Sequence, residues 1–300
     1  MFIATPEDAL VGRWGTVQEK PRVLVDLQPN GLARVFFSVG IWTANEHELR
    51  LVTPDKPDQR AVIPYSFEDK KLKVVLDQQP LTLERLEAPP EYRGPKAREQ
   101  PRILGHGFVT AGSDVYASAD LDGGIMAISS TRWVHIPGAS AKEFQPLAPG
   151  VGKDAQAVYC FRTTGGRAEP RRLEAADPKT FRVLIPDRGR TYFADAKNVF
   201  TGCEQLVKRE RASPKRLESF DSKTFALGPC GLLRDHSGLY APVPLPSSPD
   251  IKEILELMIL SQLLVYERVS GDVDSITEKN CDKLPKPSPL TWDDLPPIQL

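Results

Sequence analysis

Residues 153–159 read KDAQAVY, residues 194–200 read ADAKNVF, and residues 234–240 read RDHSGLY. In each stretch an Asp precedes an aromatic residue by five positions, with small or polar residues after the Asp. An Asp side chain can accept hydrogen bonds from the amides of a tight turn, and an aliphatic–aromatic pair suits re-entry into a sheet. The aromatic positions recur about every 40 residues, and a degraded first copy ends at Tyr116. This period predicts a domain of repeated β-hairpins.

A second motif alternates with these hairpins. Residues 176–181 (ADPKTF) match residues 220–225 (FDSKTF), and residues 139–144 (ASAKEF) form a weaker copy. Asp or Ser suits a helix N-cap, Pro suits the first helical position, and a Phe four residues after the cap turns inward. Each repeat is therefore predicted to hold a hairpin, a connector and one short helical turn anchored by a Phe.

This alternation resembles the DKNYY repeat family of bacterial proteins, whose pattern is K-D-K-N-x-V-Y-Y followed downstream by A-D-P-x-[ST]-F. Lys153, Asp154, Val158 and Tyr159 fit the first part of the pattern, and residues 176–181 fit the downstream part closely. Ala155-Gln156 and His236-Ser237 replace the signature Lys-Asn. The resemblance covers residues 105–241 and implies a repeat fold without a settled activity. Proteins of this kind resemble accessory or immunity proteins encoded near bacterial toxins.

The N-terminal part of the chain predicts a small barrel. Residues 22–29 and 32–38 are β-rich and flank Asn30-Gly31, the strongest short signal for a hairpin. Further short strands follow up to Leu86, and an up-and-down meander of this kind closes best as a barrel. With Gly12-Arg13-Trp14 opening the first strand, the segment resembles a lipocalin-like domain. That resemblance implies a small apolar ligand, which gives one alternative function.

The expected fold is mainly β, in five parts. They are a barrel domain (1–88), a linker rich in proline and charge (89–101), the repeat domain (102–247), a C-terminal helix (248–270) and a proline-rich acidic tail (271–300). The helix is predicted over 251–269 after an N-cap at Ser248, and it is apolar nearly all round from Leu257 to Val265. It either packs across the repeat domain or meets a partner or a second copy, as in a homodimer. Leu257, Leu260 and Leu264 are the candidate contact residues.

The charge composition limits the classes of binding partner to expect, and the cysteines bear on the cellular compartment. With 39 Lys and Arg against 40 Asp and Glu, nothing draws the chain globally to nucleic acid or anionic lipid. No apolar stretch is long enough to span a membrane. Cys160, Cys203, Cys230 and Cys281 are expected as thiols in the cytoplasm. The alternative is a disulfide such as Cys203–Cys230 in the periplasm, if an export signal has been removed.

The sequence shows no compact catalytic motif, no metal-ligand spacing and no phosphate loop. The four histidines are scattered, and His236 is expected as a solvated turn residue. We therefore predict no catalytic, metal or cofactor site, so the leading interpretation is a protein that is not an enzyme. An unrecognised hydrolase is the third hypothesis.

Two basic segments lie at equivalent places in successive repeats, at residues 165–172 (GGRAEPRR) and 207–216 (VKRERASPKR). They are either a solvated charged surface or an electropositive patch that anchors an acidic protein partner. The patch would consist of Arg167, Arg171, Arg172, Lys208, Arg209, Arg211, Lys215 and Arg216. The leading hypothesis is thus a bacterial immunity or accessory protein that neutralises a cognate toxin or effector by occluding it.

Overall fold

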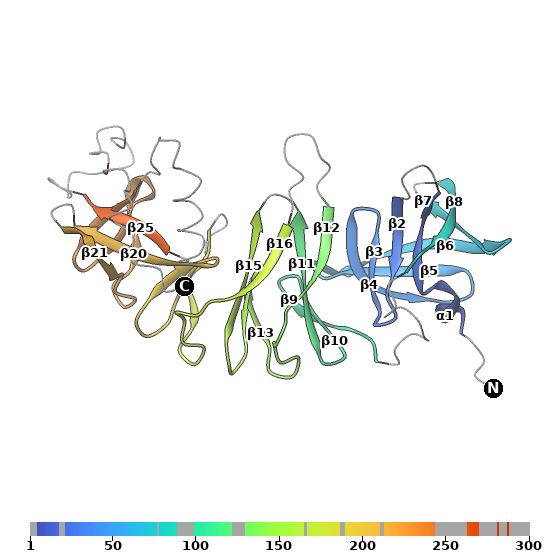
Figure 1. Cartoon of the computed structure of the whole chain (residues 1–300), viewed down its shortest axis with the longest axis horizontal. Helices are drawn as coiled ribbons and strands as arrows, with labels where there is room; N and C mark the ends of the chain where they lie inside the picture. The colour runs from blue at the N-terminus through green and yellow to red at the C-terminus, as the bar shows by residue number, and fades with distance from the viewer. Residues whose placement is uncertain are drawn as a thin grey trace. The chain divides into compact units, whose positions relative to one another are not determined.

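Figure 1 shows the fold of the chain in a computed structural model. It describes residues 5–17, 22–76, 78–88, 99–121, 130–164, 167–186, 190–210, 213–243, 263–269, 281 and 287. The chain forms two compact units, and each is considered by itself. Unit 1 comprises Met1–Ala155 and Tyr159–Arg171, and unit 2 comprises Gln156–Val158 and Arg172–Leu300.

Unit 1 begins with the five-residue helix α1 (Pro6–Leu10) and an eight-stranded closed barrel. Its antiparallel strands are β1 (Gly12–Thr16), β2 (Arg22–Leu27), β3 (Leu32–Val35), β4 (Ser38–Ala44), β5 (Glu48–Thr53), β6 (Lys56–Glu68), β7 (Lys71–Leu76) and β8 (Gln79–Leu86). Strand β8 pairs back with β1 and closes the barrel. The mainly β fold and the N-terminal barrel are thereby confirmed. Among the described residues, no helix is long and apolar enough to cross a membrane.

Large apolar side chains fill the barrel interior. Trp14 and Trp42 are at most 1% exposed and belong to one core cluster with residues such as Leu27 and Leu49. Each indole N–H has a carbonyl acceptor, Leu10 O at 2.9 Å for Trp14 and Gln28 O at 3.0 Å for Trp42. The satisfied polar atoms make these rings stable core components.

Two four-stranded sheets follow, mostly within unit 1. The first contains β9 (Arg102–Gly105), β10 (Phe108–Ala111), β11 (Asp114–Leu121) and β12 (Ser130–His135), and the second contains β13 (Gln145–Ala148), β14 (Val151–Lys153), β15 (Val158–Thr164) and β16 (Arg167–Arg172). Because side chains alternate along a strand, successive residues of β10 lie on opposite faces of the sheet. Val109 packs with barrel residues such as Ile41, whereas the Phe108 ring lies 5.0 Å from that of Phe144.

Unit 2 contains a nine-stranded sheet. Its strands are β17 (Arg182–Ile185), β18 (Tyr192–Ala194), β19 (Val199–Thr201), β20 (Glu204–Glu210), β21 (Ser213–Ser219), β22 (Ala226–Leu227), β23 (Leu233–Asp235), β24 (Gly238–Pro242) and β25 (Leu263–Arg268). Strands β17–β21 and β22–β24 come from successive repeats, and β25 joins them. It pairs parallel with β20 and antiparallel with β24.

The predicted C-terminal helix is wrong over residues 263–268, which form strand β25. Its Val265 and Tyr266 side chains are buried, and the edges of β20 and β24 supply the backbone partners. Tertiary pairing therefore decides the conformation of this apolar run. The rest of the predicted helix, residues 248–262 and 270, lies outside the described residues.

The predicted helical turns are hydrogen-bonded turns and are not assigned as helices. At residues 177–181 the Phe181 N–H donates to Asp177 O at 3.0 Å, and the chain then enters β17 directly. The inward Phe anchors are confirmed, because Phe144, Phe181 and Phe225 are all buried.

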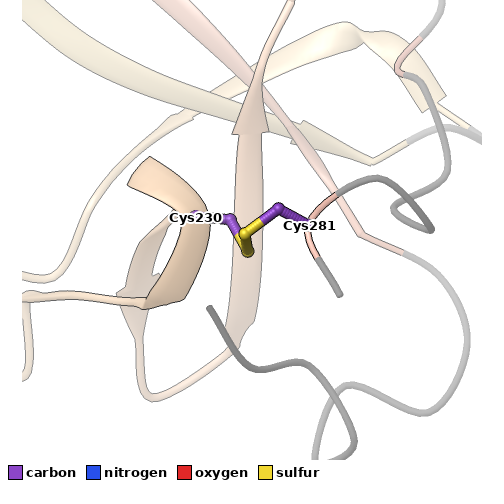
Figure 2. The surroundings of a disulfide bond; sticks show 2 residues. All are labelled: Cys230 and Cys281. Atoms are coloured by element: carbon purple, nitrogen blue, oxygen red, sulfur yellow. A yellow bond between two sulfur atoms is a disulfide. The ribbon is translucent and has the colours of Figure 1, made fainter. Parts of the chain in front are cut away.

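All four cysteines are disulfide-bonded, so the expectation of free thiols is wrong. Cys230 bonds to Cys281, with a Cα–Cα distance of 5.4 Å (Figure 2), and not to Cys203. The bridge closes a sequence separation of 51 residues that includes β25. It therefore ties the chain beyond β25 to the turn before β23.

Candidate functional site

One buried aspartate joins the two halves of each repeat. Asp154, Asp195 and Asp235 are each at most 4% exposed. Each accepts the backbone N–H of the residue that opens the preceding Phe-anchored turn. These bonds are Ser140 N to Asp154 Oδ2 (2.9 Å), Asp177 N to Asp195 Oδ2 (2.9 Å) and Asp221 N to Asp235 Oδ2 (3.1 Å). We call these three residues the clamp aspartates.

The clamp aspartates of unit 2 also hold their own hairpins. Asp195 Oδ1 accepts the N–H groups of Lys197 and Asn198 at 2.7 Å each, and Asp235 Oδ1 accepts that of Ser237 at 2.9 Å. This is the amide capping that the sequence predicts for the Asp. The additional bond to a turn 14 or 18 residues earlier was not predicted.

A second set of hydrogen bonds repeats in unit 2. Thr180 Oγ1 donates to Asp177 Oδ2 at 2.8 Å and accepts the N–H of Ala196 at 3.1 Å. Thr224 does the same with Asp221 Oδ2 at 2.7 Å and the N–H of His236 at 3.0 Å. The two repeats therefore share a scaffold at the level of individual hydrogen bonds.

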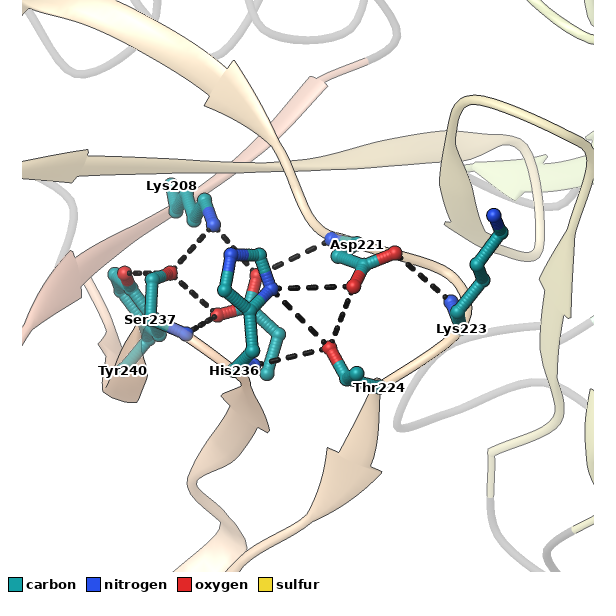
Figure 3. A network of polar contacts seen from close by, with 8 residues as sticks. Lys208, Asp221, Lys223, Thr224, His236, Ser237 and Tyr240 are labelled. Atoms are coloured by element: carbon teal, nitrogen blue, oxygen red, sulfur yellow. Dashed lines mark hydrogen bonds and ion pairs between the residues drawn. The ribbon is translucent and has the colours of Figure 1, made fainter.

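The last repeat adds a buried lysine to its clamp (Figure 3). Lys208 is 7% exposed, and its ammonium lies 2.5 Å from Asp235 Oδ2 and 2.7 Å from Ser237 Oγ. It also lies 5.8 Å from the centre of the Phe220 ring and 5.5 Å from that of Tyr240. A carboxylate, a hydroxyl and two aromatic faces thus replace the water that this charge loses on burial.

This cluster is arranged to fasten the repeat and not to activate a nucleophile. A serine acting with a lysine needs a neutral amine as its base, but Lys208 is ion-paired to Asp235. The Ser237 hydroxyl also lies 2.5 Å from Asp235 Oδ1. Burial raises the pKa of Asp235, but hydrogen bonds from Lys208 and Ser237 outweigh it and hold the pKa below its ordinary value. The carboxylate is therefore ionised at neutral pH.

His236 occupies a position that is Ala155 or Ala196 in the other copies. Its side chain is 63% exposed, as expected of a turn residue, and its Nδ1 lies 3.1 Å from Asp221 Oδ2. The Thr224 hydroxyl and the Lys223 amide, followed by His236, hold the pKa of Asp221 below its ordinary value.

We expect unit 2 to lose stability in acid. The pKa values of Asp221 and Asp235 are lower in the folded chain than the ordinary 3.8, so the unfolded chain binds protons first. Their contribution is complete above about pH 4 and is lost as the pH falls through the folded pKa values. Thermal unfolding between pH 6 and pH 2.5 should show Tm falling below about pH 4. Asp221→Asn should flatten that fall, and an unchanged profile would contradict the assignment.

Two residues of the predicted basic patch are buried, which corrects that prediction. Lys208 pairs with Asp235, and Arg209 is 2% exposed with its Nη2 3.0 Å from Glu267 Oε2. The described residues of this segment do not form a loop, because residues 207–210 lie in β20 and residues 213–216 in β21, and β20 has neighbours on both sides. Buried cations of this kind are paired, so neither charge is presented to a partner.

Arg171 and Arg172 end strand β16, where Arg172 is exposed and the Arg171 side chain is 27% exposed beside Glu169. They belong to different units. Four further patch residues have side chains outside the described set: Arg167, Arg211, Lys215 and Arg216.

The predicted leucine contacts are not available as one helix face. Leu264 lies on β25 and packs against the core cluster that contains Leu206 and Tyr240. This packing removes the reason for expecting a homodimer through Leu264. Leu257 and Leu260 lie outside the described residues.

Within the described part of the chain, no group of three or more His, Cys, Asp or Glu residues could hold a metal ion. No protein-family model, curated protein or solved structure matches the chain.

Proposed function

We propose that this chain is a protein-binding module without enzymatic activity, and that it neutralises a cognate toxin or effector by occluding it. The observation that supports this proposal is that the buried charged residues hold the repeats together. The clamp aspartates and Lys208 are engaged in fixing hairpins and turns, which holds the turns that open at Asp177 and Asp221 in defined positions. A preorganised surface loses little conformational entropy when it binds another protein.

The packed barrel favours this proposal over a small apolar ligand in the barrel. Trp14, Trp42, Leu27 and Leu49 occupy the interior at no more than 1% exposure. A ligand of ordinary size would have to displace these side chains from a closely packed core.

The disulfides support an oxidising compartment, so we propose the periplasm and not the cytoplasm as the place of action. All four cysteines are bonded, and structural disulfides persist where thiols are not kept reduced. Mass spectrometry of the chain purified from its native cells under thiol-trapping conditions tests this. Four alkylated cysteines would contradict it.

The two arginines at the end of β16, of which Arg172 is exposed and Arg171 partly buried, provide the test of partner binding. We expect Arg171→Glu with Arg172→Glu to weaken binding of an acidic partner about tenfold, because reversed charges repel it. Crosslinking in native cells first identifies the partner, and titration calorimetry then compares the variants. Lys56→Glu with Arg60→Glu, on the exposed part of β6, makes the same charge change as a control. Equal affinity of both variants would remove these arginines from the interface, and substrate turnover by the pure chain would overturn the proposal.

A further inference from the structure

A groove of about 640 Å³ lies on unit 1, between the start of β9, the β10–β11 turn and the turn at residues 140–142. Arg102, Thr110 and Lys142 line it, together with Glu99, Ser113 and Ser140. Arg102 and Lys142 have no carboxylate partner among the described residues. With Glu99 they give the groove a net charge of +1.

One residue that lines the groove has a hydroxyl without a hydrogen bond to the described residues. Thr110 is 7% exposed, yet its side chain makes no hydrogen bond to any described residue. It stands directly opposite Arg102 in the β9–β10 register, and directly paired residues of adjacent strands share a sheet face. The hydroxyl oxygen is not one of the fully buried unsatisfied atoms of the described residues, so this unbonded donor is open to a molecule in the groove. The hydroxyl and the guanidinium are therefore neighbours in the same groove.

Comparison with the later repeats shows what this groove lacks. In unit 2, Asp177 Oδ1 accepts the N–H of Lys179, and Asp221 Oδ1 accepts the N–H of Lys223, each at 3.0 Å. The equivalent pair in unit 1 is Ser140 and Lys142. Ser140 brings no carboxylate, and the Lys142 N–H has no acceptor among the described residues. The first repeat thus keeps the turn but lacks the carboxylate that occupies it elsewhere.

We propose that this groove binds a carboxylate supplied from outside the chain, in the place that an Asp side chain fills in the other two repeats. The Lys142 N–H, the Arg102 guanidinium and the Thr110 hydroxyl are the donors, and charge-assisted bonds to a carboxylate are the strongest of this kind. The carboxylate comes either from a free small acid or from an acidic side chain of another protein. This binding site does not depend on the function proposed above.

The test supplies a carboxylate to the groove in two ways, as an added compound and as a substituted side chain. In ¹⁵N NMR titrations of the full chain with sodium acetate, sodium succinate and a blocked glutamate-containing peptide, we expect a saturable shift of the Lys142 amide. Sodium chloride at equal ionic strength should give no such shift. Ser140→Asp should abolish saturation, because its own carboxylate takes the site, and the unit 2 repeats show that the turn accepts an Asp. Ser66→Asp, which adds a carboxylate on the exposed end of β6 and away from the groove, should titrate like the parent.

Arg102→Gln gives an independent variant and should weaken binding at least tenfold without altering the turn. Tighter binding of the peptide than of acetate or succinate assigns the carboxylate to a protein, and the reverse order assigns it to a free acid. The proposal is overturned if no probe gives a saturable shift. It is equally overturned if Ser140→Asp saturates at the same concentrations as the parent.

Discussion

Asp235→Ala is expected to destabilise unit 2 by about 3–5 kcal/mol, because it leaves the Lys208 ammonium buried without its carboxylate. The lysine side chain is 8% exposed and that of Asp235 is fully buried. The substitution also removes the acceptor for the Asp221 and Ser237 amides, so the turn and the hairpin separate. Urea unfolding followed by circular dichroism measures the loss, and hydrogen exchange at residues 219–240 locates it.

The matched control for this prediction is Asp195→Ala. Asp195 accepts three backbone amides in the repeat before that of Asp235, but it has no ion pair within the part of the chain that the structure describes. Its loss should cost about 1–3 kcal/mol, the usual penalty for unsatisfied buried groups. Adding Lys208→Met to Asp235→Ala should recover part of the stability, since the unpaired charge is then gone. Equal costs for the two single variants, with no recovery in the double variant, would contradict a charge-based role.

Replacing Cys230 and Cys281 together by Ser is expected to cost about 4 kcal/mol. The estimate follows from the chain entropy that a loop of this length regains in the unfolded state. The bridge spans 51 residues and lies next to the short 3₁₀ turn Pro229–Gly231. Calorimetry of the double variant without reductant measures the effect while leaving Cys160 and Cys203 bonded.

A reductant titration supplies the control for the disulfide. Dithiothreitol should lower the Tm of the parent, and the Ser variant should lose less on reduction because one bridge is already absent. A Tm for the double variant equal to that of the oxidised parent would show that the bridge adds nothing to stability.

Local patterns predicted the parts of the fold that depend on neighbours in sequence. The Asn30-Gly31 turn between β-rich runs led to the barrel, and both β2 and β3 form as expected. The Asp-to-aromatic spacing led to the hairpins, and Tyr159, Phe200 and Tyr240 are all buried. Turn chemistry and strand alternation depend on residues close together in the chain. A single sequence is therefore enough to predict them.

Long-range pairing explains what the sequence could not predict. The run that forms β25 reads as helix or strand equally well, because apolar residues line it on all sides. Cysteine spacing alone does not define partners, so Cys230–Cys281 was missed. Lys208 was assigned to the surface because charged residues are rarely buried. Its partner Asp235 lies 27 residues further along the chain. No local pattern around Lys208 indicates a pairing at that distance.

The late position of β25 has a consequence for biosynthesis. A ribosome completes the barrel strands once Leu86 has been added, but β20 and β24 wait for residues 263–268 before their shared neighbour exists. During that interval both nascent edges offer unpaired backbone groups, which other chains can join. Newly made chains should therefore need protection by a chaperone until translation has passed Arg268, and truncation before that point should produce aggregates.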